Sequence, residues 1–416
     1  MTTPTAGTKR KQAATSASFV THLECSKTGE RHKAGALWGL SRAGAPLVAR
    51  YDLDRLATAV DKAAIAARPP DMWRYREFLP LGNAPAVSLG EHMTPLVPLP
   101  DLEKNLGVAQ VLIKDEGHLP TGSFKARGMA VAVSMAKSFG VTRIAIPTAG
   151  NAGAGLAAYA ARAGIESYVF TPADTPEVTA SEIAFYGAKV WRVDGLVGDC
   201  ARIVADGAAE MGWFDFTTLK EPYRVEGKKT MGFELAEQLG WRLPDVVFYP
   251  TGGGVCVIAM WKAFQELKAI GWIDEPLPRM VAVQSTGCAP IVKAFDTGRK
   301  TTENWPDVTT NVHGVRVPNP LGGLLVLDVL YASGGFATAV DDARVHETRA
   351  RIAAETGLHI CPEGAATVVA LEQERAQGRV KAGDRVVLFN SASGLKSPMP
   401  PMTRRLAPGA VDYSRL

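Results

Sequence analysis

Lys125 is the residue of this sequence best placed to act as a reactive amine. It ends the segment KDEGHLPTGSFK (residues 114–125), which follows a strand-like apolar run, turns at residues 120–122 and presents Ser123 and Lys125 just before a helical run. A lysine near a turn is usually a solvated surface charge. Lys125 alone therefore predicts no chemistry, and its interpretation depends on three other segments.

Two turns built from small residues are suited to bind anions. The turn PTAGNAG (residues 147–153) opens a helical run, where free backbone N–H groups and the helix dipole favour an anion such as a carboxylate. Its one sizeable polar side chain, Asn151, fits the N-cap of that helix equally well. The turn PTGGGV (residues 250–255) exposes glycine amides that suit a phosphate monoester. It has neither the Gly-Lys-Ser/Thr of a P-loop nor the G-x-G-x-x-G spacing of a dinucleotide site.

A fourth segment, RVVLFNSASGLK (residues 385–396), is a strand-like run that ends in two serines. Ser391 and Ser393 each fit an ordinary turn or cap as well as a ligand contact. In their order, the four segments resemble the fold-type-II pyridoxal 5'-phosphate (PLP) enzymes, the family of tryptophan synthase β, and the resemblance spans residues 89–401. It implies PLP as cofactor and a two-domain α/β fold with mainly parallel sheets and an N-terminal extension.

The resemblance also implies roles for single residues. Lys125 becomes the Schiff-base lysine and the catalytic residue. The implied cofactor contacts, besides Lys125, are Asn151 to the 3'-oxygen, Gly252, Gly253, Gly254 and Val255 to the phosphate, and Ser391, with Ser393 as the alternative, to the pyridine nitrogen. The implied substrate contacts are Ser123, Thr148, Ala149, Gly150, Thr218, Arg224 and Glu363.

The chemistry of PLP enzymes needs these residue types. The lysine must be available as a neutral amine, and desolvation beside other cationic groups lowers its pKa. Once the substrate displaces it, the freed amine serves as the general base for the α-proton. A neutral hydroxyl at the pyridine nitrogen does not stabilise the protonated ring, which suits elimination and replacement better than transamination.

Within this family, the sequence is most similar to the threonine synthases. The similar stretches are residues 93–96, 221–241, 314–328 and 393–396. The resemblance implies conversion of O-phosphohomoserine and water to threonine and phosphate, with a deep phosphate site around Arg224 and Thr218. It also implies a homodimer.

Two departures leave the substrate open. The Asn-Ser pair and the further Asn that typical threonine synthases carry are replaced by TLKE (residues 218–221), and Ala126 stands where many have Asp. Lys220, Lys228 and Lys229 are candidates for the lost phosphate donors, while a solvated, charged helix start over residues 224–229 is the alternative. The changes favour, as a second hypothesis, an ammonia-lyase acting on threonine, serine or a related amino acid. A third hypothesis, a non-catalytic ligand-binding relative, is opposed by Lys125.

Two further local features have alternative explanations. Glu363 lies in the turn CPEGAA (residues 361–366) before a helical run, where it either orients the substrate or caps the helix. The leader HLECSKTGE (residues 22–30) has Thr28 where a C-x-x-C pair needs its second cysteine. We therefore predict no zinc ribbon and no metal site. Cys256 and Cys361 lie in apolar contexts typical of core residues.

The elements that must position these residues alternate between β-rich runs and helical, alanine-rich runs. The predicted strands are residues 111–114, 143–147, 167–170, 189–193, 245–250, 280–284 and 385–389. This alternation indicates an α/β fold with parallel sheets, whose ligands bind at the carboxyl ends of the strands. We predict a tail and extension over residues 1–84, a large PLP-binding domain over 85–129 and 223–416, and a smaller mobile domain over 130–222. Residues 51–67 are helix-like, and residues 21–84 show few clear strands.

Composition excludes several classes of function. The 416 residues are 46% hydrophobic and carry a formal net charge of only +4, so no global field points to nucleic acid or to an anionic membrane. No apolar run approaches the length of a membrane helix. The five cysteines are scattered, which fits reduced thiols in the cytoplasm. Small polar or anionic metabolites remain open as partners, and the resemblance implies a small amino-acid substrate. Residues 1–20, basic and without an acid, fit a disordered tail better than a transit peptide.

Overall fold

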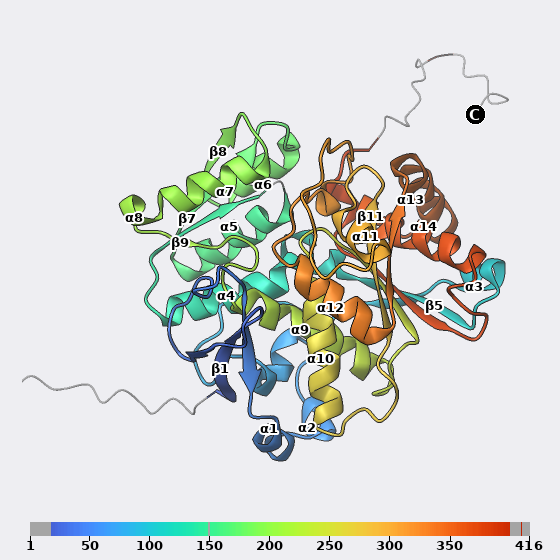
Figure 1. The fold of residues 1–416 in the computed structure, drawn as a ribbon, viewed down its shortest axis with the longest axis horizontal. Coiled ribbons are helices and arrows are strands. Elements are labelled where there is room, and N and C mark those ends of the chain that lie inside the picture. Colours follow the sequence, from blue (N-terminus) through green and yellow to red (C-terminus); the bar gives the residue numbers. More distant parts are fainter. Residues whose placement is uncertain (1–17, 149, 400–408, 410–416) are drawn as a thin grey trace, which may run out of the picture.

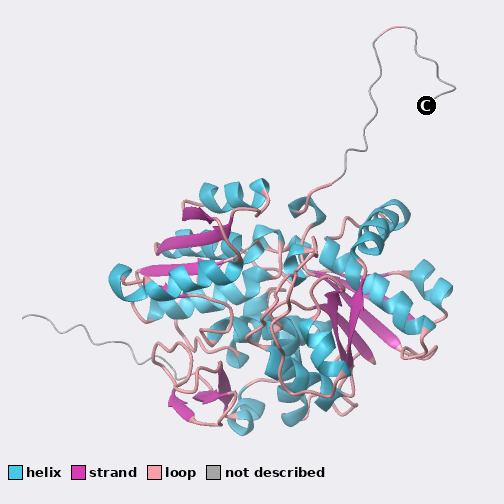
Figure 2. Ribbon diagram, turned by 45° about the horizontal axis from the view of Figure 1, so that its top comes forward, coloured by secondary structure: helices cyan, strands magenta, loops and turns pink. Residues whose placement is uncertain are grey.

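The computed structural model describes residues 18–148, 150–399 and 409 of the chain. In this part the chain forms three β-sheets of six, four and three strands with helices packed around them (Figure 1). The two larger sheets occupy opposite halves of the molecule, and helices lie on both sides of their strands (Figure 2).

The six-stranded sheet has the order β12-β11-β10-β13-β5-β4. Its strands are β4 (Leu96–Pro98), β5 (Gln110–Asp115), β10 (Val246–Pro250), β11 (Arg279–Ser285), β12 (Phe336–Val340) and β13 (Arg385–Asn390). All neighbouring strands run parallel except β4, which pairs antiparallel with β5. The carboxyl ends of β5, β10 and β13 therefore meet at one edge of the sheet, where ligands of such folds bind.

Both faces of this sheet are buried, as is usual for parallel strands. Along β10, Val247 and Tyr249 join one hydrophobic core, while Val246 and Phe248 join the core on the opposite face. The first core is completed by α9 (Tyr223–Gln238), α10 (Val255–Ala269), α11 (Pro290–Asp296) and α12 (Gly323–Ser333). The second is completed by α3 (Pro100–Leu106), α13 (Asp342–Thr356) and α14 (Pro362–Ala376).

The four-stranded sheet is parallel and has the order β8-β7-β6-β9. Its strands are β6 (Arg143–Pro147), β7 (Glu166–Pro172), β8 (Lys189–Val193) and β9 (Phe214–Asp215). The helices α4 (Lys125–Ser138), α5 (Asn151–Ala163) and α6 (Glu177–Phe185) share one core with it, and α7 (Val197–Asp206), followed by α8 (Ala208–Met211), covers the other face. These strands fall within the predicted smaller domain, and α4 runs through its predicted boundary at residue 129. The domain boundaries and the mobility stay predictions.

The N-terminal extension forms a small antiparallel sheet of order β2-β1-β3, which is not evident from the sequence. Its strands are β1 (Val20–Cys25), β2 (Arg31–Lys33) and β3 (Leu47–Tyr51). The expected single helical run over residues 51–67 is wrong: α1 (Leu53–Ala59) and α2 (Lys62–Ala66) are separated because Val60 is extended and the Asp61 side chain caps α2. The segment then turns through η1 (Met72–Phe78), a 3-10 helix.

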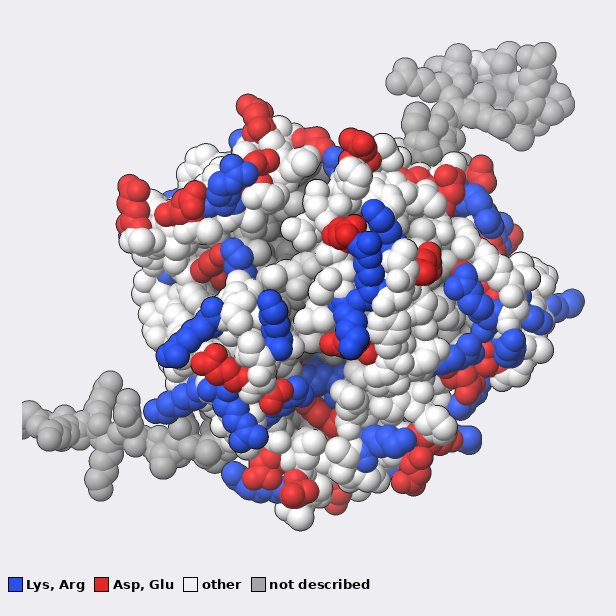
Figure 3. Space-filling view, viewed as in Figure 1, with Lys and Arg blue, Asp and Glu red and all other residues white. Residues whose placement is uncertain are grey.

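Basic and acidic side chains are interspersed over the visible face, without a field of one sign (Figure 3). No helix in the described residues is long and apolar enough to cross a bilayer. In the same residues, no three His, Cys, Asp or Glu side chains are grouped as a metal site would need.

Candidate active site

Lys125 is the first residue of α4 and follows two 3-10 turns, η2 (Glu116–His118) and η3 (Pro120–Gly122), that leave the end of β5. The turn is tight, since Thr121 and Gly122 both have positive φ values of 60° and 61°. It is fastened to the end of β13, because the Phe124 N–H donates to the Ser391 carbonyl (3.1 Å) and the Ser393 N–H donates to the Gly122 carbonyl (2.8 Å). Two segments far apart in the chain thus hold Lys125 in place.

The amine of Lys125 has an altered protonation equilibrium. Its Nζ lies 4.1 Å from the centroid of the Phe124 ring. Burial lowers the pKa of Lys125 to about 8, and the Arg224 guanidinium adds to this lowering, against the opposing effects of Cys256 and Glu363. A neutral amine is therefore accessible at a pH at which an exposed lysine is almost fully charged. This is the property that an amine nucleophile needs.

The turn after β6 lies beside Lys125. A Cβ added to Gly155 of α5 would lie 3.4 Å from the Lys125 Cβ, so the first turns of α5 pack against the start of α4. Gly150 is the N-cap of α5 and its N–H donates to Thr148 Oγ1 (3.0 Å). The N-cap interpretation of Asn151 is therefore wrong, because Asn151 is the first helical residue. Ala149 lies outside the described residues.

The glycine turn between β10 and α10 has no room for side chains. Gly254 has a φ of +82°, and a Cβ there would lie 2.2 Å from Val326 Cγ2. A Cβ on Gly252 would lie 2.6 Å from the Gly314 carbonyl oxygen, and one on Gly253 would lie 3.5 Å from Thr218 Cγ2. The turn is thus enclosed by neighbours, including the predicted Thr218, and Val255 then opens α10.

The two predicted serines differ in their surroundings. Ser391 is buried, and its Oγ lies 3.6 Å from the Cys361 Sγ. The Ser393 Oγ instead accepts a hydrogen bond from the Leu395 N–H (3.3 Å), as the cap of a 3-10 turn (Gly394–Lys396). Ser391 is therefore the better placed of the two for a ligand contact, and that role stays a prediction.

Arg224 lies on the buried first turn of α9. Its side chain and those of Glu226, Lys228 and Lys229 are all buried, so the alternative of a solvated helix start is wrong. Arg224 Nη1 donates to the Phe216 carbonyl (2.7 Å), while Nε and Nη2 are buried without a hydrogen-bond partner in the described part of the chain. A buried guanidinium with two unused donors is suited to an anionic ligand.

Glu363, in the first turn of α14, contacts the loop over the glycine turn. Its carboxylate accepts from the Gly314 N–H (2.7 Å), within the 3-10 turn His313–Val315 whose Gly314 carbonyl faces Gly252. Capping by Glu363 is wrong, since the N-cap acceptor of α14 is the Cys361 Sγ, which accepts from the Gly364 N–H (3.3 Å). Glu363 thus positions a loop at the candidate site.

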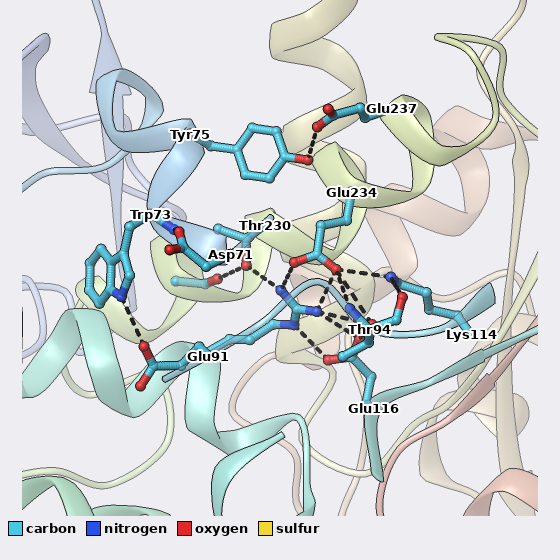
Figure 4. Close-up of polar contacts among 12 residues, drawn as sticks. Asp71, Trp73, Tyr75, Glu91, Thr94, Lys114, Glu116, Thr230, Glu234 and Glu237 are labelled. Atoms are coloured by element: carbon cyan, nitrogen blue, oxygen red, sulfur yellow. Dashed lines mark hydrogen bonds and ion pairs between the residues drawn. The ribbon is translucent and has the colours of Figure 1, made fainter. Parts of the chain in front are cut away.

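A fully buried charge network, which sequence reasoning missed, anchors α4 two residues beyond Lys125. Arg127 donates to Glu116 (2.6 and 2.9 Å) and to Glu234 (2.5 and 2.8 Å). Lys114 pairs with Glu234 (2.9 Å), and Thr94 Oγ1 donates to Glu116 (2.7 Å). Lys114 and Thr94 donate to Glu234 from other elements of the core, and Glu116 lies beside Thr94 (Figure 4). Hydropathy alone gives no sign that these charges are interior.

Comparison with known proteins agrees with this arrangement. Residues 87–392 match the family described as pyridoxal-phosphate dependent enzyme. The chain belongs to this family. It is 35% identical over 378 residues to the threonine synthase of Methanocaldococcus jannaschii, covering 90% of this chain and 92% of the relative. It is 31% identical over 395 residues to the threonine synthase of Methanosarcina acetivorans, covering 94% of this chain and 96% of the relative. Maize serine racemase superposes with a TM-score of 0.62 at 20% identity, covering 73% of this chain and 88% of that one, which shows the fold.

The family confirms PLP as the cofactor and the predicted fold type, and the residues present fit the cofactor. The lowered pKa of Lys125 suits an amine that attacks an aldehyde, and the enclosed glycine turn has the backbone and dipole of a phosphate cradle. The hydroxyls of Thr121 and Ser123 are buried and unpaired within the described residues, as are two nitrogens of Arg224. When bound, PLP supplies an aldehyde for the amine and a ring that accepts the electron pair released at the substrate Cα.

Proposed function

We propose that the protein is a threonine synthase, a PLP-dependent lyase that converts O-phosphohomoserine and water to threonine and inorganic phosphate. One observation carries the proposal: the buried Arg224, with Nε and Nη2 unused, is close enough to Lys125 to lower the pKa of its amine. A reactive amine and an anion site thus share one location. The relatives named threonine synthase support the same reaction.

Each residue of the candidate site has a defined role in this reaction. The freed Lys125 amine removes the proton from the substrate Cα. A Cβ proton is then lost as the phosphate, held by Arg224, leaves from Cγ. Water adds its hydroxyl at Cβ, and protons return to Cγ and Cα, so that the products are threonine and inorganic phosphate. Thr148, Gly150 and Asn151 bind the substrate carboxylate and the cofactor at the start of α5, and Ser391 contacts the ring nitrogen. Glu363 holds the Gly314 loop over the glycine turn, which binds the cofactor phosphate through Gly252, Gly253, Gly254 and Val255.

The test is phosphate release from O-phosphohomoserine by purified, PLP-loaded protein, followed by detection of threonine in equal amount. Lys125→Ala, as control, should abolish both products. Absence of phosphate release refutes the proposal. Formation of a ketoacid from L-threonine, without phosphate release from O-phosphohomoserine, identifies an ammonia-lyase instead.

We further propose that the enzyme is a cytoplasmic homodimer. We also propose that residues 130–222 form a smaller domain that moves during turnover. All five cysteines are free and buried, which supports a reducing compartment. Light scattering of the purified full-length chain gives its mass in solution, and a monomer contradicts the dimer.

A further inference from the structure

Lys228 is a buried lysine without an ion pair among the described residues. It lies on α9 with a relative exposure of 1%. The adjacent Lys229 is equally buried but pairs with Glu226 (2.7 Å) and Glu266 (2.8 Å). In the part of the chain that the structure describes, no ion pair and no hydrogen bond is found for Lys228 Nζ. The atom lies against the aromatic ring of Phe124. Lys220, another candidate for a phosphate donor, is engaged with Asp215 (2.9 Å).

The position of Lys228 brings it to the candidate site. Its Nζ lies 5.2 Å from the centroid of the Phe124 ring, the same ring that Lys125 Nζ contacts at 4.1 Å. A Cβ added to Gly128 would lie 3.0 Å from the Lys228 Cε, so the glycine leaves the space in which the lysine side chain lies along α4. Burial lowers the pKa of Lys228 well below its ordinary value, with Cys256 in the first turn of α10 as its next strongest neighbour. Lys228 is therefore near both the reactive amine and the helix start that follows the glycine turn.

The charges around Lys228 are unbalanced. Arg224 and Lys125, both cationic, lower its pKa, and the Glu221 carboxylate raises it. The Glu221 carboxylate already accepts from the N–H groups of Tyr223 (2.8 Å) and Arg224 (3.2 Å) and lies 3.9 Å from Arg224 Nε. Buried cations without compensation are costly, so this arrangement favours a bound anion. The α10 helix, 15 residues long, adds its N-terminal dipole at the same place.

We propose that Lys228 is the charged contact of a phosphate monoester bound beside the face of α9 that carries Arg224 and Lys228. The inference deepens the proposed function and rests on it. A phosphate dianion fits the combination of a lysine, an arginine with unused donors and a helix N-terminus. The phosphate belongs either to the cofactor or to the substrate and its product. Binding measurements with PLP and with inorganic phosphate distinguish these two sources.

The experiment compares the wild type with Lys228→Gln, Lys228→Arg and the control Lys268→Gln, an exposed lysine in the last turn of α10. The first arm measures the dissociation constants of PLP and of pyridoxal, which lacks the phosphate, on the cofactor-free full-length chain. The second arm measures binding of inorganic phosphate to the PLP-loaded protein by calorimetry. Loss of one charge-assisted contact predicts a weakening of about 10-fold or more in Lys228→Gln, with recovery in Lys228→Arg and no change in Lys268→Gln.

Each outcome decides the proposal. Weaker PLP binding with unchanged pyridoxal binding supports it and assigns the cofactor phosphate. Weaker binding of inorganic phosphate with unchanged PLP binding supports it and assigns the substrate phosphate. Binding of all three ligands within about twofold of the wild type overturns it.

A crystal structure of the PLP-loaded wild type with inorganic phosphate covers the case of a variant that does not fold. Lys228 Nζ at hydrogen-bond distance from a phosphate oxygen supports the proposal, and Nζ more than about 6 Å from every phosphate oxygen overturns it. These measurements need no turnover. If the protein releases no phosphate from O-phosphohomoserine, the proposed function is refuted and the binding result still stands. If the enzyme is active and the binding of all ligands is unchanged in Lys228→Gln, only the role of Lys228 is refuted.

Discussion

Arg127→Met is expected to destabilise the protein strongly, because Arg127 is the centre of the buried charge network below Lys125. The side chains of Arg127, Glu116, Glu234 and Lys114 are all fully buried and carry two positive and two negative charges. Removal of Arg127 leaves two carboxylates with Lys114 alone, which is an uncompensated negative charge in the core. Breaking such a pair costs about 3–5 kcal/mol of unfolding free energy.

The assay is urea unfolding of wild type and variants at constant pH. The matched control is Arg143→Met, which breaks an ion pair with Glu166 (2.9 Å) between half-exposed side chains and should cost at most about 1 kcal/mol. The double variant Arg127→Met/Glu116→Gln should recover part of the loss, since it removes the unpaired charge.

The loss also has a defined dependence on pH. Arg127 and Lys114 hold the pKa of Glu234 below its ordinary value of 4.5 against the raising effect of burial. A depressed pKa in the folded state stabilises above the unfolded pKa and is lost as the pH falls, so the deficit of Arg127→Met should be largest above pH 4.5 and shrink below it. If Arg127→Met costs no more than Arg143→Met at pH 7, the network is not desolvated as described and the reasoning is refuted.

Three further predictions concern the cofactor site. The rate at which PLP attaches covalently to the cofactor-free protein should rise with pH to a midpoint near 8, because only the neutral amine attacks the aldehyde and burial lowers the pKa of Lys125 from 10.5 to about 8; a midpoint near 10.5 contradicts this. Gly254→Ala should weaken PLP binding and lower the melting temperature, since its Cβ would lie 2.2 Å from Val326 Cγ2, whereas Gly198→Ala, with nothing within 4 Å, should do neither; equal behaviour of the two variants contradicts the steric argument. Ser391→Ala should shift the absorbance spectrum of the bound cofactor and Ser393→Ala should not; the reverse result exchanges their roles.

Much of the fold could be predicted because its strands are continuous apolar runs. The predicted strands 143–147 and 189–193 match β6 and β8 at both ends, and the other five are found within two residues of their predicted ends. The strand β12 (FATAV) was missed, since its small and polar residues give a weak signal. The N-terminal sheet could not be predicted either, because the strands of 3 to 6 residues in this sheet carry several charged side chains. Their pairing depends on contacts with the body of the protein, such as the hydrogen bond from Tyr51 to Glu226 (2.7 Å).

The candidate site was predictable where topology alone determines proximity. Three of its segments follow β5, β10 and β13 of one sheet, so their loops gather at the same edge, while the turn after β6 belongs to the four-stranded sheet. The interior position of residues 224–229 was not predictable, because their charges are typical of a solvated helix. It depends on close packing of α4 and α9, which glycines permit: a Cβ on Gly227 would lie 2.1 Å from the Arg127 carbonyl oxygen. No local pattern in the sequence reports that contact.

The helix α9 carries two groups of buried charged side chains. Glu226, Lys229 and Glu234 are matched by partners on neighbouring elements, which are Tyr51, Lys262, Glu266, Arg127 and Lys114. Arg224 and Lys228 are four residues apart and so share one face of the helix. Both are buried; Arg224 Nε and Nη2 have no hydrogen-bond partner among the described residues, and Lys228 Nζ lies against the Phe124 ring. Charges that serve folding are balanced within the protein, whereas charges that serve binding are balanced by the ligand. The phosphate chemistry proposed for this chain therefore depends on the Arg224 and Lys228 face of α9 more than on the altered TLKE segment at residues 218–221.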